Sequence, residues 1–270
     1  MNAIAKRYQS LSGRFTYGFK DTYFLDLNFG LNGSENFQSG KQYGFFPAVA
    51  VGWVPTQYEF MKQLKWLNFM KIRASYGLVG NDRISNMRFP YLTIIEEKSD
   101  TTPWGGSGVL TENRVGADNL AWEKAKKFDI GMDLHLFDNR FTMSVDYFHD
   151  RREGIFQQRA QIPDYVGVIT MPYGNVGSMT SWGGDGNFEY FQPIGKNFHF
   201  TLRGNFTLSK NKINNWEEAM QPYPYLSKTG FSNDVQRGFI SLGLFKDQQD
   251  VDMSPSSSAR CARATSNTRT

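Results

Sequence analysis

The sequence has 270 residues, enough for one large or two ordinary domains, and its net charge of +4 is spread without blocks of Lys and Arg. This charge distribution gives no reason to expect nucleic acid as a partner. Hydrophobic residues make up 40% of the chain, and no run approaches the ~20 apolar residues of a membrane-spanning helix, so only a β-barrel could cross a bilayer.

Strands are predicted wherever apolar and polar residues alternate with period two. Two hairpins are the clearest: Phe128 to Leu136 with Phe141 to Tyr147, joined by the tight turn Phe137-Asp138-Asn139-Arg140, and a later pair at 186–191 and 198–209. The full set of about nine predicted strands is 11–19, 22–31, 43–53, 69–78, 128–136, 141–147, 186–191, 198–209 and 237–246.

Strand lengths and connections favour a barrel in a membrane. Many predicted strands are near the ~9 to 11 residues of a tilted membrane-crossing strand, against a mode of ~5 to 6 in globular sheets. Short turns near 20, 138 and 194 alternate with long Gly-, Pro- and Asn-rich connections, as in outer-membrane barrels. The connection 54–68 departs from this pattern and predicts a brief amphipathic helix. The long connections are predicted at 32–42, 79–122, 153–180 and 212–236.

An alternative fits some of the same features. Aromatic residues make up 16% of the chain, which suits interfacial girdles but also carbohydrate-binding β-sandwiches. A soluble, aromatic-rich β-sandwich module that binds carbohydrate is therefore the competing hypothesis, and it requires the apolar rows to be buried between two sheets.

Several phrases of this sequence resemble the C-terminal barrel region of SusC/RagA-type TonB-dependent outer-membrane transporters. Six of them occur in the family's order across most of residues 7 to 250. They are YGFFPAVAVGW (43–53), KIRASYGLVGN (71–81), NLAWEKAKKFDIGMDLHLFDNRFTMSVDYFHDRREGIF (119–156), YGNVGSMTSWGGDGNFEYF (173–191), NFTLSKNKI (205–213) and GLFKDQQD (243–250).

The resemblance implies a function and partners. Members of this family import nutrients, typically glycan or peptide fragments, through a large plugged β-barrel in the outer membrane. The partners that it implies are a SusD-like surface lipoprotein and the TonB complex. No enzyme motif accompanies these phrases, so we expect a transporter without catalysis.

The expected fold is therefore all-β, with the antiparallel strands of an incomplete transmembrane β-barrel and long extracellular loops. Nothing in the sequence resembles the family's signal peptide, plug domain or TonB-contacting segment, so we expect a fragment that does not function alone. Residues 1–253 are predicted to be the partial barrel. Residues 254–270 lose the aromatics and hold the only cysteine, Cys261. The family usually has a phrase like RPGDIKYKD here, which a shifted reading frame would turn into CARATSNTRT, so we expect a frameshifted, disordered tail.

The polar face of the predicted strands carries the candidate site residues. His135, His149 and His199 have no metal-ligand spacing, and no phosphate loop is present, so neither a metal nor a cofactor is expected. Polar residues of the strands are expected to face the lumen and to contact substrate or plug, unless they simply hydrate the channel wall. These lumen-facing candidates are Lys71, Arg73, Asp129, Asp133, Ser144, Asp146, Arg203 and Asn205.

Overall fold

The structure is a computed structural model in which the chain forms two compact units, Met1–Asn233 and Asp234–Thr270. The structure describes residues 7–83, 89–98, 108–117, 119–163, 166–167, 170–195, 197–238, 240–244, 247–253 and 266–269.

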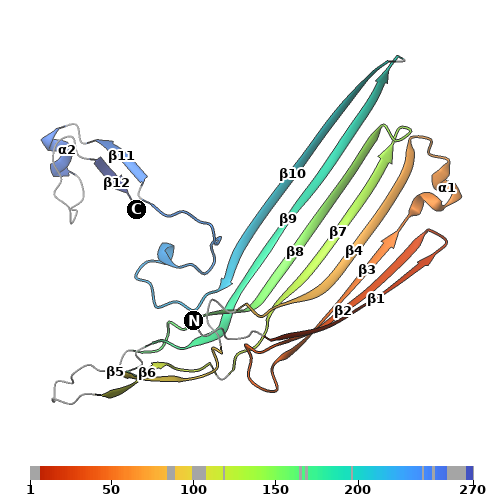
Figure 1. Ribbon diagram of the computed structural model, residues 1–270. Coiled ribbons are helices and arrows are strands. Elements are labelled where there is room, and N and C mark those ends of the chain that lie inside the picture. The colour runs from red at the N-terminus through yellow and green to blue at the C-terminus, as the bar shows by residue number, and fades with distance from the viewer. Residues whose placement is uncertain are drawn as a thin grey trace. The chain divides into compact units, whose positions relative to one another are not determined.

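The first unit is built on one antiparallel sheet of eight strands, which lie side by side in a curved sheet (Figure 1). Every strand pairs with its neighbour in the order of the chain, and β1 and β10 form the two edges of the sheet. In order the strands are β1 (Tyr8–Phe19), β2 (Tyr23–Ser34), β3 (Tyr43–Trp53), β4 (Leu67–Asn81), β7 (Glu123–Leu136), β8 (Phe141–Gln158), β9 (Tyr173–Ile194) and β10 (Phe198–Asn215).

The strand register collects apolar side chains on one face. A row of directly paired residues crosses all eight strands and consists of apolar residues and one glycine. It runs Tyr17, Leu25, Val51, Ala74, Ile130, Tyr147, Gly184 and Leu208. Because successive side chains alternate between faces, the row next to it belongs to the opposite face and is mostly polar or small. We call the first the apolar face and the second the polar face.

The apolar face is exposed. Tyr17 is 52% exposed, Val51 51% and Leu208 72%, and the described residues include no second sheet that covers them. A β-sandwich buries such rows between its two sheets, so the sandwich alternative is not favoured. A continuous exposed apolar surface of this kind is typical of a protein that contacts lipid.

The apolar band has the height of a bilayer. On β7 it runs from Phe128 to Leu136, and on β10 from Phe198 to Leu208, which is the ~9 to 11 residues of a tilted transmembrane strand. The strands β8, β9 and β10 are longer, with 18, 22 and 18 residues. Their paired strand structure therefore continues beyond the apolar band.

This continuation corrects both ends of the predicted connection 153–180. Residues 153–158 and 173–180, expected to be loop, belong to β8 and β9. Ion pairs hold the neighbouring β7 and β8 together in this polar region, where Lys126 Nζ lies 2.8 Å from Glu153 and Arg152 Nε lies 3.1 Å from Glu123. Alternation of apolar residues does not reveal strands of this composition.

Short turns close the strands at one end of the sheet. Phe137, Asp138 and Asn139 all have positive φ, at 55°, 55° and 61°, and form the turn predicted between β7 and β8. The side chain of Asn68 stabilises this turn by accepting a hydrogen bond from the backbone N–H of Asp138 at 2.8 Å. Between β3 and β4 lie η1 (Pro55–Gln57) and α1 (Glu59–Lys62), so the short helix expected in 54–68 is confirmed.

The long connections lie at the other end and carry a small hydrophobic core. Phe37, Phe46, Ala117, Leu120 and Trp122 are buried together, and the indole N–H of Trp122 donates to the carbonyl of Gln42 at 3.2 Å. The connection between β4 and β7 also contains a hairpin that was not predicted. Its strands are β5 (Ile94–Lys98) and β6 (Val109–Arg114). After β10 comes η3 (Pro224–Leu226).

The second unit contains β11 (Ile240–Leu244), α2 (Gln248–Met253) and β12 (Ser266–Arg269). β11 is the ninth predicted strand, and it pairs with β12 instead of extending the eight-stranded sheet. Residues 254–265 of the expected disordered tail lie outside the described residues, whereas 266–269 form a strand. The boundary at 253 and the frameshift stay predictions. No described helix is both long and apolar enough to span a membrane.

Candidate functional site

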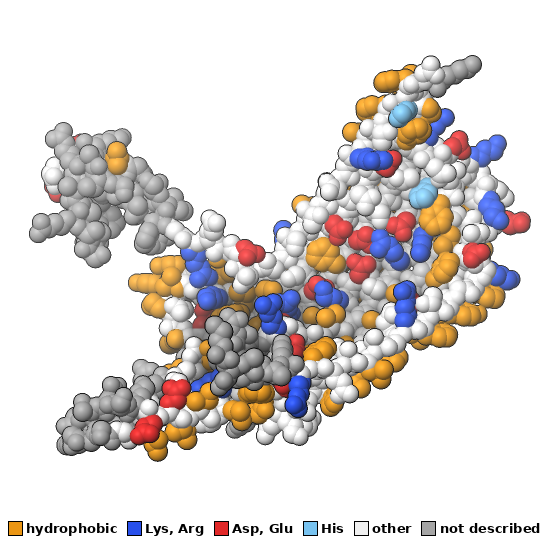
Figure 2. Space-filling view, in the orientation of Figure 1, with side chains coloured by type: hydrophobic (Ala, Val, Ile, Leu, Met, Phe, Trp, Pro, Cys, Tyr) orange, Lys and Arg blue, Asp and Glu red, His pale blue; other side chains and the backbone are white. Residues whose placement is uncertain are grey.

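The polar face of the sheet is the candidate site. All eight candidate residues occupy positions of this face, because the register places them between the positions of the apolar rows. Figure 2 shows Asp, Glu, Lys and Arg side chains gathered over the middle of the sheet, with hydrophobic side chains along its margin. The structure brings four of the candidates into one hydrogen-bonded cluster and two into a separate groove.

The cluster is centred on Arg73 of β4. Its Nη2 donates to Asp146 Oδ2 at 2.7 Å and to Ser144 Oγ at 3.1 Å, both on β8. Its Nε lies 3.3 Å from Oδ2 of Asp133 on β7. The hydroxyl of Ser144 in turn donates to Asp133 Oδ1 at 2.7 Å. One guanidinium thus joins three strands, and charge-assisted hydrogen bonds of this kind are the stronger ones.

Gly131 makes this reach possible. It is paired with Arg73 on one side and with Asp146 on the other, so Arg73 must pass over it. A Cβ atom at this position would lie 1.9 Å from Asp146 Oδ1 and 3.0 Å from Arg73 Cζ. The absence of a side chain on β7 therefore lets β4 and β8 connect directly.

Carboxylates outnumber the cations in this region. Asp146 is paired directly with Asp185 of β9, and Asp129 is repelled by Asp146, Asp185 and Asp150. Like charges placed opposite each other on neighbouring strands are destabilising. Oδ1 of Asp146 is buried and accepts no hydrogen bond from the described residues. Arg73 forms ion pairs with two carboxylates of this acidic region, those of Asp133 and Asp146.

Lys71 does not join the cluster. Its Nζ lies over the ring of Phe24 on β2, 5.4 Å from the ring centroid. This cation–π contact holds the Lys71 side chain on the polar face. Lys71 lies two residues before Arg73 on β4.

Arg203 and Asn205 of β10 line a groove of about 400 Å³ together with Thr142, Asn187 and Glu189. Arg203 donates to both carboxylate oxygens of Glu189, from Nε at 3.0 Å and from Nη2 at 3.2 Å. The groove is walled by hydrogen-bonding side chains, which suits a polar partner more than an apolar one.

The sequence prediction missed four residues of this face: Gly131, Asp185, Asn187 and Glu189. Asn187 and Glu189 lie within the predicted strand 186–191, with the parity opposite to Phe188 and Tyr190, so the same alternation could have identified them. Asp185 lies inside β9, one residue before the predicted strand 186–191. Gly131 carries no side-chain signal of its own.

An open antiparallel sheet with an exposed apolar band of bilayer height on one face and a charged, hydrogen-bonded opposite face is a section of transmembrane β-barrel. Residues 4–248 match the model of the family described as "TonB dependent receptor-like, beta-barrel". The chain belongs to this family, as the phrases of the sequence predicted.

Relatives of known name agree with this result. TonB-dependent receptor P3 of Formosa agariphila is 32% identical over 207 residues, which are 76% of this chain and 20% of the relative. TonB-dependent receptor SusC of Bacteroides thetaiotaomicron is 25% identical over 207 residues, with the same two shares. The SusC-like character of the chain is thereby confirmed. The chain spans about a fifth to a quarter of the length of the curated relatives it matches.

Solved structures support the fold. The structure of the RagAB peptide importer in its open-open state superposes with a TM-score of 0.73 at 23% identity and covers 88% of this chain and 26% of that chain. The closed-closed state of the same importer gives a TM-score of 0.72 at 22% identity, covering 90% of this chain and 26% of that chain.

Proposed function

We propose that this chain is part of the wall of a TonB-dependent outer-membrane transporter that imports nutrients such as glycan or peptide fragments. The observation that carries the proposal is the register that puts an apolar band of bilayer height on one face of all eight strands and charged side chains on the other. Acyl chains suit the first face and a water-filled lumen suits the second.

The connections at the two ends of the sheet indicate which end faces the periplasm and which faces the outside of the cell. Outer-membrane barrels have short turns on the periplasmic side and long loops outside the cell. By this rule the turn at residues 137–140 faces the periplasm. The hydrophobic core formed by Phe37, Phe46, Ala117, Leu120 and Trp122 then lies under the extracellular loops.

The proposal includes partners. Transport through this kind of barrel requires energy from a TonB complex, and the family resemblance adds a SusD-like surface lipoprotein over the barrel. The relatives support both, because they carry the name TonB-dependent receptor and include SusC. The substrate of the solved neighbour is named a peptide.

A complete transporter needs more strands than the described sheet contains. The edges β1 and β10 do not pair with each other among the described residues. Each unpaired backbone group costs several kcal/mol in hydrocarbon, so two bare edges cost on the order of tens of kcal/mol. We therefore propose that the sheet works only within a longer barrel.

The lumen-facing candidates are assigned to this function with two roles. The Arg73 cluster joins β4, β7 and β8 through its own hydrogen bonds and is proposed to stabilise the wall. The groove beside Arg203 and Asn205 is proposed to contact the plug or the passing substrate, because it offers several polar groups around an open space.

The test is uptake of glycan and peptide mixtures by cells that carry the full-length receptor gene, compared with a deletion strain. Restored uptake by the gene is the expected result. Asn205→Trp, which fills the groove, should reduce uptake, whereas Thr201→Trp on the same strand and face should not. A deletion strain that takes up these nutrients as well as its parent would contradict the proposal.

A further inference from the structure

Cations gather on the apolar face of β7, β8 and β10, just beyond the apolar band. On β7 the band ends at Phe128, and Lys126 follows on the same face, two residues closer to the long connections. On β10 the band ends at Leu208, and Lys210 follows in the same way. We call the cations at these positions the basic belt, which consists of Lys124, Lys126, Arg151, Lys210 and Lys212.

The strand pairing brings the belt together. Lys126 is paired with Arg151 of β8, Arg151 with Thr180 of β9, and Thr180 with Lys212 of β10. Lys126 and Lys212 are therefore three strand spacings apart, or about 14 Å. The side chain of Lys126 is 44% exposed, and the other four cations of the belt are exposed as well. The whole belt can thus contact a ligand.

The belt has more positive charge than its neighbours neutralise. Beyond the band, Glu153 is the one carboxylate that the described residues of β7 to β10 place on this face. It pairs with Lys126 Nζ and with Arg151 Nε, at 2.8 Å in each case. The other three cations of the belt form no ion pair with the described residues. One carboxylate for five cations leaves a large excess of positive charge.

The polar face of the same strands is different at this height. There Lys127 Nζ lies 3.5 Å from Asp150, and Arg152 Nε lies 3.1 Å from Glu123. Each of these cations has a carboxylate of its own. The excess of cations therefore belongs to the apolar face, where a membrane would lie.

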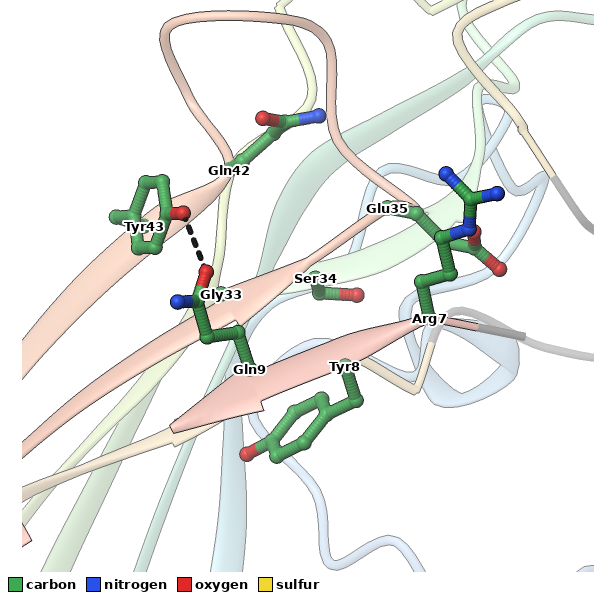
Figure 3. Close-up of a pocket in the computed structure, with 8 residues that line it drawn as sticks. All are labelled: Arg7, Tyr8, Gln9, Gly33, Ser34, Glu35, Gln42 and Tyr43. Carbon is green, nitrogen blue, oxygen red and sulfur yellow. Dashed lines mark hydrogen bonds between the residues drawn. The ribbon is translucent and has the colours of Figure 1, made fainter. Parts of the chain in front are cut away.

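The corresponding end of β1, β2 and β3 carries a balanced pocket. Its volume is about 290 Å³, and its lining includes one cation, Arg7, and one carboxylate, Glu35. The hydroxyl of Tyr43 donates to Gln9 Oε1 at 2.8 Å in this pocket (Figure 3). The basic belt is thus a local feature of β7, β8 and β10, not a ring of cations along the whole sheet.

A ligand for the belt must combine negative charge with acyl chains. Lysines at the end of an apolar band place their ammonium groups at the depth of lipid headgroups. Their charge-assisted hydrogen bonds suit phosphate oxygens. A soluble anion would gain nothing from the apolar band, which Phe128 and Leu208 bring directly up to the belt. In the proposed orientation, this end of the band lies in the leaflet that faces the outside of the cell.

We propose that the basic belt binds a phosphorylated lipid of the outer leaflet. Lys126, Lys210 and Lys212 bind its phosphates, and its acyl chains lie along the apolar band. The width of the belt is enough for a headgroup that carries more than one phosphate. The inference rests on the proposed function, since it requires the apolar face to meet a membrane and the long connections to lie outside the cell.

The experiment is native mass spectrometry of the full-length receptor, stripped of lipid in detergent and titrated with lipid A, a glycolipid with two phosphates. Lys210→Gln combined with Lys212→Gln should lower the affinity about 25-fold, because each cation beside an anionic lipid contributes about fivefold. The matched control is Lys127→Gln combined with Arg152→Gln. It removes two cations from the polar face at the same height and should bind lipid A like the wild type.

Two further measurements isolate the phosphates. Dephosphorylated lipid A has the same acyl chains and should bind the wild type about tenfold more weakly. Glu153→Gln should strengthen the binding of lipid A, because Lys126 and Arg151 lose their ion pairs within the protein. A gain of affinity cannot result from misfolding, so this variant and the dephosphorylated lipid decide the matter if the double variant of β10 does not fold.

Heat-modifiable migration on a gel shows whether each variant is folded. Equal affinity of the wild type for lipid A and its dephosphorylated form overturns the site, and so does equal affinity of the wild type and the folded double variant of β10 for lipid A. Nutrient uptake is measured separately. Normal uptake together with unchanged lipid A binding in that variant contradicts this inference and leaves the proposed function standing.

Discussion

Gly131 leaves room for the side chain of Arg73 on β4 to reach Asp146 on β8 across the polar face of β7. The contacts of Arg73 with Asp133, Ser144 and Asp146 all depend on an empty position at the centre of the cluster. A glycine normally weakens a strand, because it has no side chain to pack and loses more entropy. Here that cost is offset by charge-assisted hydrogen bonds that no larger residue would permit.

Gly131→Ala in the full-length receptor should therefore destabilise the barrel. The added methyl group collides with Asp146 Oδ1 and must displace it from Arg73, with an expected loss of about 1 to 3 kcal/mol. Urea unfolding in lipid vesicles measures this free energy. Gly30→Ala is the control, because the nearest atom to its Cβ is Asn32 Nδ2 at 3.8 Å. Equal stability of the two variants would show that the cluster does not depend on this glycine.

Glu218 gives the loop after β10 a dependence on pH. Burial acts to raise the pKa of Glu218, but hydrogen bonds from the Ser227 hydroxyl and from the backbone N–H groups of Lys228 and Thr229 outweigh it and lower the pKa below 4.5. A lowered pKa means that the charged form is favoured by the folded loop. Its contribution to stability is therefore present above pH 4.5 and is lost as the pH falls through the lowered pKa.

We predict that the backbone amides of Lys228 and Thr229 lose protection from hydrogen exchange as the pH falls through the lowered pKa of Glu218. Protection is the ratio of the intrinsic to the observed exchange rate at each pH. Glu218→Gln should have weak protection that does not change with pH. Persistent protection in Glu218→Gln would refute the assignment.

The sequence predicted which face of the sheet a side chain lies on, but not which other side chains it contacts. Alternation alone placed Arg73, Asp133 and Asp146 on one face, and the register confirms that placement. Their mutual contacts could not be predicted, because the pairing of β4 with β7 depends on how the long intervening connection folds. The role of Gly131 follows only from that pairing.

At the scale of the strand, the face assignment itself can be tested on β10. Leu202 belongs to the apolar face and Thr201, its neighbour, to the polar face. Leu202→Lys places a charge near the middle of the apolar band and should cost about 2 to 4 kcal/mol, whereas Thr201→Lys should cost less than about 1 kcal/mol. Unfolding in lipid vesicles measures the free energy of unfolding of both variants. A larger loss of stability for Thr201→Lys than for Leu202→Lys would contradict the assignment of the two faces.

Whole strands were predictable where their composition alternates, and less so where it does not. The arms around Phe137 to Arg140 and the turn itself were recovered because apolar residues alternate up to the turn. The parts of β8 and β9 nearest the long connections were not predicted. Polar residues such as Arg151, Glu153 and Ser178 occupy both faces of the sheet there, so apolar and polar residues do not alternate. Their pairing is stabilised by backbone hydrogen bonds and by ion pairs such as that between Lys126 and Glu153, which period-two hydropathy does not report.

At the scale of the molecule, the two edges β1 and β10 decide what the isolated chain can do. An open sheet in hydrocarbon is penalised by more than the ~5 to 15 kcal/mol of ordinary fold stability. Expressed alone, residues 1–270 should aggregate or be degraded, and they should show no heat-modifiable migration. The full-length receptor, prepared in parallel, should show it. Heat-modifiable migration of the isolated chain, or nutrient uptake by cells that carry only this chain, would contradict this expectation.

The length of β9, 22 residues, determines how far the sheet extends beyond the bilayer. At about 3.3 Å per residue the strand is about 70 Å long, while a tilted strand needs only ~9 to 11 residues to cross the bilayer. In the proposed orientation, roughly half of β9 therefore extends beyond the bilayer on the outside of the cell. A bacteriophage or an antibody that approaches the cell would reach this hydrophilic collar well before the membrane, so antibodies raised against residues 173–180 should label intact cells.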